Sequence, residues 1–219
     1  MTKPSNKVLL FVNGDLPAPE NLLSMIHSND ILVAVDGGLR HIHKLGLKPD
    51  LIIGDLDSAE PDQVDDSQSK GVKVLSFPTE KNETDLELAI NEALKLSTSA
   101  IWVIAALGKR IDQTLGNIFL LTRPDLTGQD IRLVDGENEV LLIRSSYTIH
   151  GRPGQWVSLL PIHGPVEGIR TTGLLYALEN ETLYPEKTRG ISNTLTSPTA
   201  SITIENGMLL CIHQISEYD

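Results

Sequence analysis

The chain has 219 residues, of which 40% are hydrophobic and 21% are charged, as is usual for a soluble globular protein. Its formal net charge of −11 disfavours nucleic acid as a partner, because a general polyanion binder needs a basic surface. The first residues lack the apolar stretch of a signal peptide, no apolar run is long enough for a membrane span, and Cys211 is the only cysteine. The composition therefore predicts a cytoplasmic protein with no disulfide, no membrane segment and no nucleic-acid partner.

Short apolar runs organise the first part of the chain. They are rich in β-branched residues and nearly continuous, which is typical of strands covered on both faces, and they occupy residues 8–12, 31–35, 51–53, 72–77, 101–107 and 131–134. The segments between them are long enough for helices. The clearest, residues 84–96, begins with Thr84 and Glu87 in the spacing of a capping box. This alternation predicts an α/β domain over residues 1–139, with a doubly wound, mostly parallel sheet and flanking helices.

The helical spacing disappears after residue 140. Short apolar segments separated by Gly, Pro and Asn turns follow, at residues 140–143, 147–149, 156–161, 200–205 and 208–215. This pattern predicts a C-terminal antiparallel β domain over residues 140–219, and Glu-Asn-Gly at 205–207 predicts a hairpin. Trp102 and Trp156 both lie within apolar runs, so we expect both side chains in the core.

Acidic residues follow several of the predicted parallel strands. Asp36-Gly37-Gly38 follows the second strand, residues 54–58 (Gly-Asp-Leu-Asp-Ser) follow the third, and Asp85 starts the helix after the fourth. Residues 108–113 (Gly-Lys-Arg-Ile-Asp-Gln) follow the fifth. Ligands of open α/β sheets bind at the carboxyl ends of the strands. We therefore expect these acids to converge at one edge of the sheet.

Asp55 and Asp57 are the strongest metal-ligand candidates. In an extended segment their side chains would point to one side, about 7 Å apart, and could share Mg²⁺. An Asx-type turn with solvated acids is the alternative. Asp85 is either a third ligand or an acid favoured by the helix dipole alone.

Basic residues and histidines leave similar alternatives. Residues 108–110 (Gly-Lys-Arg) either hold anionic oxygens or form a solvated turn. His41 and His43 lack metal-ligand spacing, and we expect both at the surface.

Several motifs, taken in order, resemble the thiamine pyrophosphokinase (thiamine diphosphokinase) family. They are DGG (36–38), IIGDLDS (52–58), K-x-x-T-D-x-E-x-A (81–89), G-x-R-x-D-x-x-L-G-N (108–117), G-L-x-Y (173–176) and S-N (192–193). The sequence departs from the family pattern at Asn82, where bacterial members usually have Asp, at Gln113, where many have His, and at Ala177, where Pro is common.

The resemblance implies an N-terminal α/β domain that binds ATP and Mg²⁺, and a C-terminal β-sandwich that binds thiamine and forms a homodimer. It implies transfer of the diphosphoryl group of ATP to the hydroxyethyl oxygen of thiamine, which yields thiamine diphosphate and AMP.

The resemblance also implies roles for individual residues. Asp55, Asp57 and Asp85 would hold Mg²⁺. Asp36 would belong to the same acidic group near the thiamine hydroxyl, and Asp36 or Asp112 is the hypothetical base. The residues that would contact ATP are Lys81, Thr84, Lys109, Arg110, Asp112 and Gln113. Those that would contact thiamine are Asp36, Tyr176, which stacks on a ring, and Ser192 and Asn193 at the pyrimidine end.

Other functions remain open from the residues alone. An Asp-x-Asp sequence after a strand also occurs in Mg²⁺-dependent phosphohydrolases and in nucleotide-sugar transferases. A non-catalytic nucleotide-binding module would bind Mg·ATP without turnover. The product distinguishes them: AMP from a pyrophosphokinase, inorganic phosphate from a phosphatase and a nucleoside diphosphate from a glycosyltransferase.

Overall fold

The computed structural model describes residues 6–57, 59–96 and 98–216, so that Ser58 of the 52–58 motif lies outside the described residues. The chain divides into two compact units, the first ending at Gly136 and the second beginning at Glu137. The boundary expected between residues 139 and 140 lies within strand β7 (Asn138–Ile143). Within the described ranges, no helix is both long enough and apolar enough to cross a membrane.

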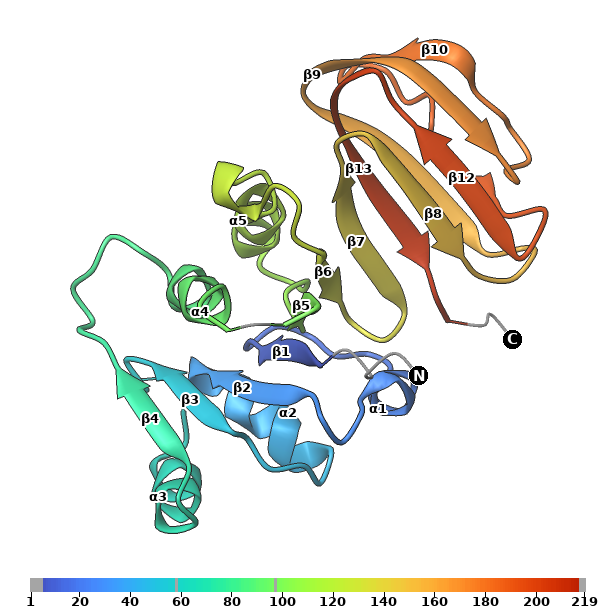
Figure 1. The fold of residues 1–219 in the computed structure, drawn as a ribbon. Helices are drawn as coiled ribbons and strands as arrows, with labels where there is room; N and C mark the ends of the chain where they lie inside the picture. The colour runs from blue at the N-terminus through green and yellow to red at the C-terminus, as the bar shows by residue number, and fades with distance from the viewer. Residues whose placement is uncertain (1–5, 58, 97, 217–219) are drawn as a thin grey trace. The chain divides into compact units, whose positions relative to one another are not determined.

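The first unit is built on a parallel sheet. Each predicted apolar run forms a strand, namely β1 (Lys7–Phe11), β2 (Ile31–Val35), β3 (Leu51–Gly54), β4 (Lys73–Ser76), β5 (Ala100–Ile104) and β6 (Ile131–Val134). The spatial order is β4-β3-β2-β1-β5-β6, and every neighbouring pair is parallel (Figure 1). All residues of β5 are buried, including Trp102, as its apolar sequence predicts.

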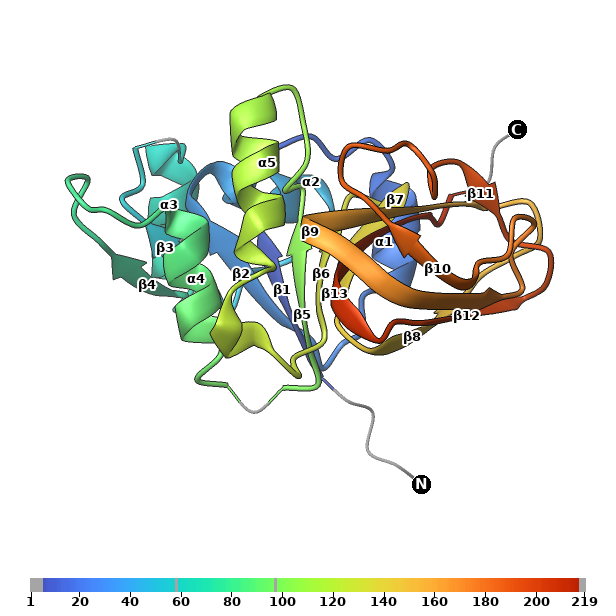
Figure 2. The ribbon, with the colours of Figure 1, turned by 90° about the horizontal axis from the view of Figure 1, so that it is seen from above.

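Helices cover both faces of this sheet. They are α1 (Pro19–Met25), α2 (Leu39–Lys44), α3 (Pro61–Ser69), α4 (Asp85–Ala93) and α5 (Ile111–Leu120), with short 3₁₀ helices at Asp36–Gly38 and Pro124–Leu126. Figure 1 shows α4 and α5 on one face and α1, α2 and α3 on the other, and Figure 2 shows α4 and α5 side by side. The strand order reverses between β1 and β5, which creates the position where ligands bind in such sheets.

The α4 helix begins as its sequence predicts. The Thr84 side chain accepts a hydrogen bond from the backbone N–H of Glu87 at 3.2 Å, which caps the helix. Leu86, Ala89 and Ile90 on its inner face are buried, and the helix contacts β1, β2 and β3. Packing of this stripe places the first turn of α4 near the carboxyl ends of those strands.

The second unit is a sandwich of antiparallel strands. These are β7 (Asn138–Ile143), β8 (Ser146–His150), β9 (Trp156–Thr172), β10 (Glu179–Leu183), β11 (Asn193–Thr194), β12 (Thr199–Thr203) and β13 (Asn206–Gln214). The long strand β9 belongs to both layers: residues 157–162 pair with β13, whereas residues 170–172 pair with β12. The change lies near His163 and Gly164, whose φ values of 64° and 137° are both positive. The core between the layers contains Ile149, Leu159 and Ile202.

Two predictions for this unit are wrong. The turn at 205–207 connects β12 to β13 but forms no hairpin, because both strands pair with β9 instead of with each other. The turn residues determine only that the chain changes direction. Because β9 is long, β12 and β13 each pair with a different part of it. Trp156 is also not in the core, since 54% of its surface is exposed at the first position of β9.

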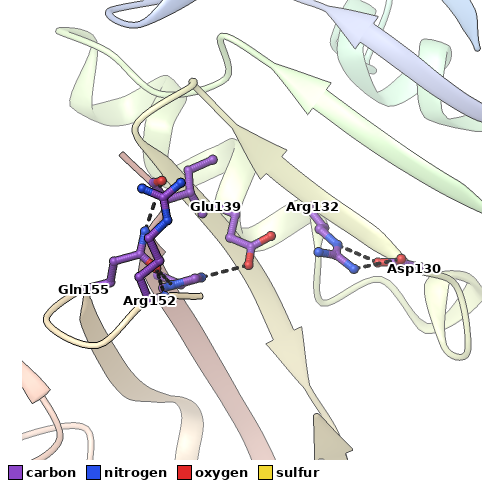
Figure 3. Close-up of polar contacts among 7 residues, drawn as sticks. Asp130, Arg132, Glu139, Arg152 and Gln155 are labelled. Carbon is purple, nitrogen blue, oxygen red and sulfur yellow. Dashed lines mark hydrogen bonds and ion pairs between the residues drawn. The ribbon is translucent and has the colours of Figure 1, made fainter. Parts of the chain in front are cut away.

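A buried polar network crosses the interior of the second unit. His213 is fully buried, and its Nδ1 lies 3.0 Å from Oε1 of Glu139 and its Nε2 lies 3.2 Å from Oε1 of Gln155. Figure 3 shows Glu139 and Gln155, with the backbone N–H of Arg152 donating to the same Gln155 oxygen at 2.8 Å. The Gln155 amide nitrogen donates to the carbonyl of Ile215 at 3.1 Å. These bonds satisfy polar groups that would otherwise be costly to bury.

Candidate functional site

The Asp36 loop lies unusually close to the end of β1. A side chain at Gly38 would place its Cβ 1.8 Å from the carbonyl oxygen of Phe11, so only glycine fits there. Gly54, with φ of 149°, likewise lies against Asp36, whose Cβ would be 3.1 Å from an added Cβ. The glycines of both motifs therefore allow the ends of β1, β2 and β3 to come together around Asp36.

Asp36, Asp55 and Asp57 form a compact group of carboxylates. One carboxylate oxygen from each lies within 4.8 Å of the others. The segment is not extended as we expected, because Leu56 has a φ of 66° and the backbone N–H of Asp57 donates to Oδ1 of Asp55 at 3.2 Å. The left-handed backbone at Leu56 folds the two carboxylates toward each other. Hard oxygen ligands at this spacing suit a divalent cation such as Mg²⁺.

Lys81 links this group to the start of α4. Its Nζ lies 2.9 Å from Oδ1 of Asp85 and 3.6 Å from Oδ2 of Asp55, and only 12% of its side chain is exposed. Burial alone would lower the pKa of Lys81, but the hydrogen bond and charge of Asp85 outweigh it and raise that pKa. The backbone N–H of Asp57, together with the Lys81 charge, lowers the pKa of the Asp55 carboxyl. Lys81 and Asp55 are therefore both charged at neutral pH.

A cleft of about 580 Å³ opens at the carboxyl ends of β1 and β5, on the face that carries α4 and α5. Its volume is in the range of small-molecule sites. The predicted site residues that line it are Asp36, Thr84, Asp85, Lys109, Arg110, Asp112 and Gln113. Asp55, Asp57 and Lys81 are outside this lining, and Asp36 belongs both to the cleft and to the carboxylate group.

The α5 helix holds the loop that follows β5. The Asn117 side chain donates to the carbonyl of Ala106 at 2.7 Å, and the Thr114 hydroxyl accepts from the N–H of Gly108 at 3.2 Å. Arg110 and Asp112 pair through two hydrogen bonds of 2.9 and 2.6 Å at the exposed entrance. The Arg110 hydrogen bonds lower the pKa of Asp112 to about 2. Asp112 is thus ionised, and both of its oxygens accept hydrogen bonds from Arg110, which makes it a poor base in this arrangement.

The sequence analysis missed the loop after β1. Asn13, Gly14 and Asp15 line the cleft, and the N–H groups of Gly14 and Asp15 bond to the carbonyls of Ala105 and Leu107. These residues follow an apolar strand as Asp36 and Asp55 do, so the same rule would have found them.

The prediction that His41 lies at the surface is wrong. His41 is 8% exposed, and its Nε2 lies 3.0 Å from the carbonyl of Gly14. Burial lowers its pKa, so the imidazole is neutral at pH 7 and stabilises the loop after β1.

In the second unit, Asn193 holds the backbone of Tyr176. The Asn193 amide oxygen accepts from the N–H of Tyr176 at 3.0 Å, and its nitrogen donates to the Tyr176 carbonyl at 2.8 Å. Asn193 is 4% exposed, whereas the Tyr176 side chain is 59% exposed. The exposed Ser192 has a φ of 57°, and its N–H donates to the Ser158 hydroxyl at 3.1 Å. The contacts of Asn193 thus serve to fix Tyr176.

Comparison with known proteins assigns both units. A family model described as thiamin pyrophosphokinase, catalytic domain, matches residues 22–134, and a second, for its vitamin B1 binding domain, matches residues 146–209. The chain belongs to the thiamin pyrophosphokinase family. It is therefore an enzyme of this family, and neither the phosphohydrolase nor the nucleotide-sugar transferase alternative is favoured.

Individual relatives agree with this assignment. The thiamine pyrophosphokinase of Bacillus subtilis is 27% identical over 200 residues, covering 89% of this chain and 94% of the relative. The crystal structure of a Bacillus subtilis thiamine pyrophosphokinase superposes with a TM-score of 0.87 at 25% identity, covering 97% of this chain and 100% of the other. That from Geobacillus thermodenitrificans has a TM-score of 0.84 at 26% identity and covers 96% and 98% of the two chains.

Proposed function

We propose that this enzyme transfers the diphosphoryl group of ATP to the hydroxyethyl oxygen of thiamine and releases AMP. The observation that carries the proposal is the group of Asp36, Asp55 and Asp57, with ligand atoms within 4.8 Å, next to a cleft where the strand order reverses. Transfer between phosphorus and oxygen depends mainly on positioning and charge neutralisation, which this arrangement offers.

The residues present fit Mg²⁺. The donors are carboxylate oxygens, the ligands that Mg²⁺ prefers, and they lie close enough to share one ion. Asp36, Asp55 and Asp57 would hold it. Asp85 lies nearby, because Lys81 pairs with both Asp85 and Asp55. When bound, Mg²⁺ neutralises phosphate charge and fixes the orientation of the triphosphate.

Side chains of the cleft supply the remaining positive charge. Lys109 and Arg110 lie in its lining and would contact the oxygens of the phosphate chain, with Lys81 on the side of the carboxylates. Thr84 and Gln113, which begin α4 and α5, add polar groups at the same edge. Asp36 is the better proposed base for the thiamine hydroxyl, since Asp112 is paired with Arg110.

The second unit would contribute the thiamine contacts. The exposed ring of Tyr176 would stack on a thiamine ring, and Ser192 would contact the pyrimidine end. Asn193 would act through Tyr176, because both polar atoms of its amide bond to the Tyr176 backbone.

We also propose a homodimer in the cytoplasm. Exposed apolar residues recur every four positions on α5, where Ile111, Leu115 and Phe119 are 71%, 48% and 52% exposed. Such a row is typical of a helix face that another chain covers, and it lies on the first unit instead of on the C-terminal β-sandwich that the resemblance implied. Sedimentation equilibrium that shows a dimer would support the proposal, and a monomer at micromolar concentration would refute it.

The reaction is tested by incubating the protein with Mg·ATP, with and without thiamine, and separating the products by chromatography. We expect AMP and thiamine diphosphate in equal amounts, and AMP only when thiamine is present. Asp55→Asn and Asp57→Asn should each lower turnover by at least about 100-fold, because each removes one negative charge from the proposed Mg²⁺ site. Asp62→Asn, an exposed acid on α3, is the matched control. Phosphate release without thiamine, or full activity of Asp55→Asn, would overturn the assignment.

A further inference from the structure

A second cavity, of about 520 Å³, lies on the opposite side of the loop after β1. It is lined by Gly14, Asp15, Leu16, Pro17, Pro19, Arg40, His41, Lys44, Leu45 and Lys109. The catalytic cleft is lined by α4 and α5, whereas this cavity is lined by α1 and α2 from the other face of the sheet. Gly14, Asp15 and Lys109 line both, so they form a shared wall.

The second cavity is basic in an otherwise acidic protein. Arg40, Lys44 and Lys109 line it, and Asp15 is the only acid among its lining residues, although the chain has a net charge of −11. Arg40 and Lys44 are four positions apart on α2, and like charges at this spacing destabilise a helix. Among the described residues, neither Lys44 nor Lys109 has a hydrogen-bond or salt-bridge partner. An anion in the cavity would remove this repulsion.

The Arg40 guanidinium is already held in place. Its Nη2 donates to the carbonyls of Asn13 and Gly14 at 3.0 and 3.1 Å, and the buried His41 contacts the same Gly14 carbonyl. These bonds use one nitrogen of Arg40 and leave Nε and Nη1 without a partner among the described residues. A planar guanidinium fixed in this way is suited to phosphate oxygens, which accept charge-assisted hydrogen bonds.

We propose that this cavity binds a free oligophosphate anion, of the size of inorganic diphosphate, at a site separate from the nucleotide cleft. Arg40 and Lys44 bind it from α2, and Lys109 binds it from the shared wall. Because Lys109 also lines the cleft, an anion here competes for a cation that nucleotide phosphates use. The site therefore couples the enzyme to the concentration of free oligophosphate.

Calorimetric titration of the full chain with inorganic diphosphate, in EDTA and without thiamine, tests the site. We expect Lys44→Gln to weaken binding about tenfold, since it removes one charge-assisted contact. Lys73→Gln changes an exposed lysine outside both cavities and should leave the affinity unchanged. Equal affinities of the wild type and Lys44→Gln would overturn the proposal.

Two further results distinguish binding in this cavity from binding in the cleft. Arg110→Gln removes a cation that lines only the cleft, so binding that depends on Lys44 should persist in this variant. If Arg110→Gln weakens diphosphate binding as much as Lys44→Gln does, the phosphate position belongs to the cleft and a separate site is refuted. No turnover enters these titrations, so their failure is distinguishable from failure of the proposed reaction.

Discussion

At the scale of single residues, the site combines an unusual backbone at Leu56 with a partly buried cation, Lys81, that pairs with its carboxylates. Leu56 has a φ of 66°, in a region that residues other than glycine, asparagine and aspartate rarely adopt, and Asp36 has a φ of 49°. Strain of this kind persists where the surrounding structure enforces it, often at functional sites. Here it directs the carboxylates of Asp55 and Asp57 into one group.

Leu56 offers a direct test of this geometry. Leu56→Gly should keep the free energy of unfolding within about 1 kcal/mol of the wild type, because glycine adopts positive φ without strain. Leu56→Val should lower it by about 1 kcal/mol or more and weaken cation binding, since a β-branched residue resists this backbone. Urea denaturation and a Mn²⁺ titration followed by electron paramagnetic resonance measure the two effects. Wild-type Mn²⁺ affinity in the valine variant would contradict the argument.

Lys81 should stabilise the acidic group before a cation binds. Its raised folded-state pKa gives a contribution that is fully present at neutral pH and is lost only as the pH rises through that pKa. Lys81→Met should therefore lower the free energy of unfolding in EDTA by about 1 kcal/mol, as Asp55 and Asp85 lose their partner.

Urea denaturation in EDTA and in Mg²⁺ would measure this role of Lys81. Mg²⁺ should restore more stability to Lys81→Met than it adds to the wild type. The exposed Lys73→Met serves as the control for loss of one positive charge. The same Mg²⁺ effect in both variants would mean that Lys81 does not neutralise the site.

At the scale of elements, function depends on what holds each loop to its neighbouring strand or helix. Asn117 and Thr114 bind the loop after β5 to α5, and Arg40 and His41 bind the loop after β1 to α2. In the second unit, one buried side chain, Asn193 of β11, does the same for the Tyr176 segment.

Replacing Asn193 should release that segment. Asn193→Ala removes hydrogen bonds to both backbone groups of Tyr176, so we expect the free energy of unfolding to fall by about 2–3 kcal/mol. Amide hydrogen exchange at Tyr176 should become faster. Asn193→Asp keeps the acceptor for the Tyr176 N–H but loses the donor to its carbonyl, so its effect should be intermediate.

The exposed Ser192→Ala is the neighbouring control and should leave exchange at Tyr176 unchanged. Under the proposed reaction, Asn193→Ala should raise KM for thiamine more than it lowers kcat. Unchanged exchange at Tyr176 in Asn193→Ala would show that the bonds to Asn193 do not hold the segment.

At the scale of the whole molecule, the buried Asp30 links two distant segments and makes the stability of the fold depend on pH. Asp30 connects the start of β1 to the turn before β2, since its carboxylate accepts from the N–H groups of Lys7 and His27, both at 2.9 Å. Burial would raise its pKa, but these bonds and the Lys7 charge outweigh it and lower the pKa. A lowered folded-state pKa adds stability above the unfolded pKa, and this stability is lost as the pH falls through the folded value.

Asp30→Asn should therefore cost stability mainly at neutral pH. We expect the free energy of unfolding to fall by about 2 kcal/mol at pH 7, because a buried charged acceptor is lost. The difference from the wild type should shrink as the pH falls below about 4, where Asp30 of the unfolded chain binds a proton before the native carboxylate does. Urea denaturation at pH 7 and pH 3 measures both values, and an equal difference at the two pH values would contradict the assignment.

Much of the fold and part of the site follow from the sequence. Continuous β-branched runs form strands because they can be buried on both faces, and the Thr84–Glu87 spacing caps α4 locally. Because parallel strands end at one edge, the residues after them could be placed near one another before the structure was known. The loop after β1 was missed although the same rule covers it, since Asn13-Gly14-Asp15 is an ordinary turn sequence when taken alone.

Thus the sequence by itself determined the order of the elements, the family and the carboxylates that converge. The tertiary structure alone decided the left-handed backbone at Leu56, the burial of His41, the exposure of Trp156 and the sharing of β9 by two layers. Local patterns report how one segment can be buried and capped. They do not report which distant segment supplies the partner, and each of these four features depends on such a partner or on its absence at that position.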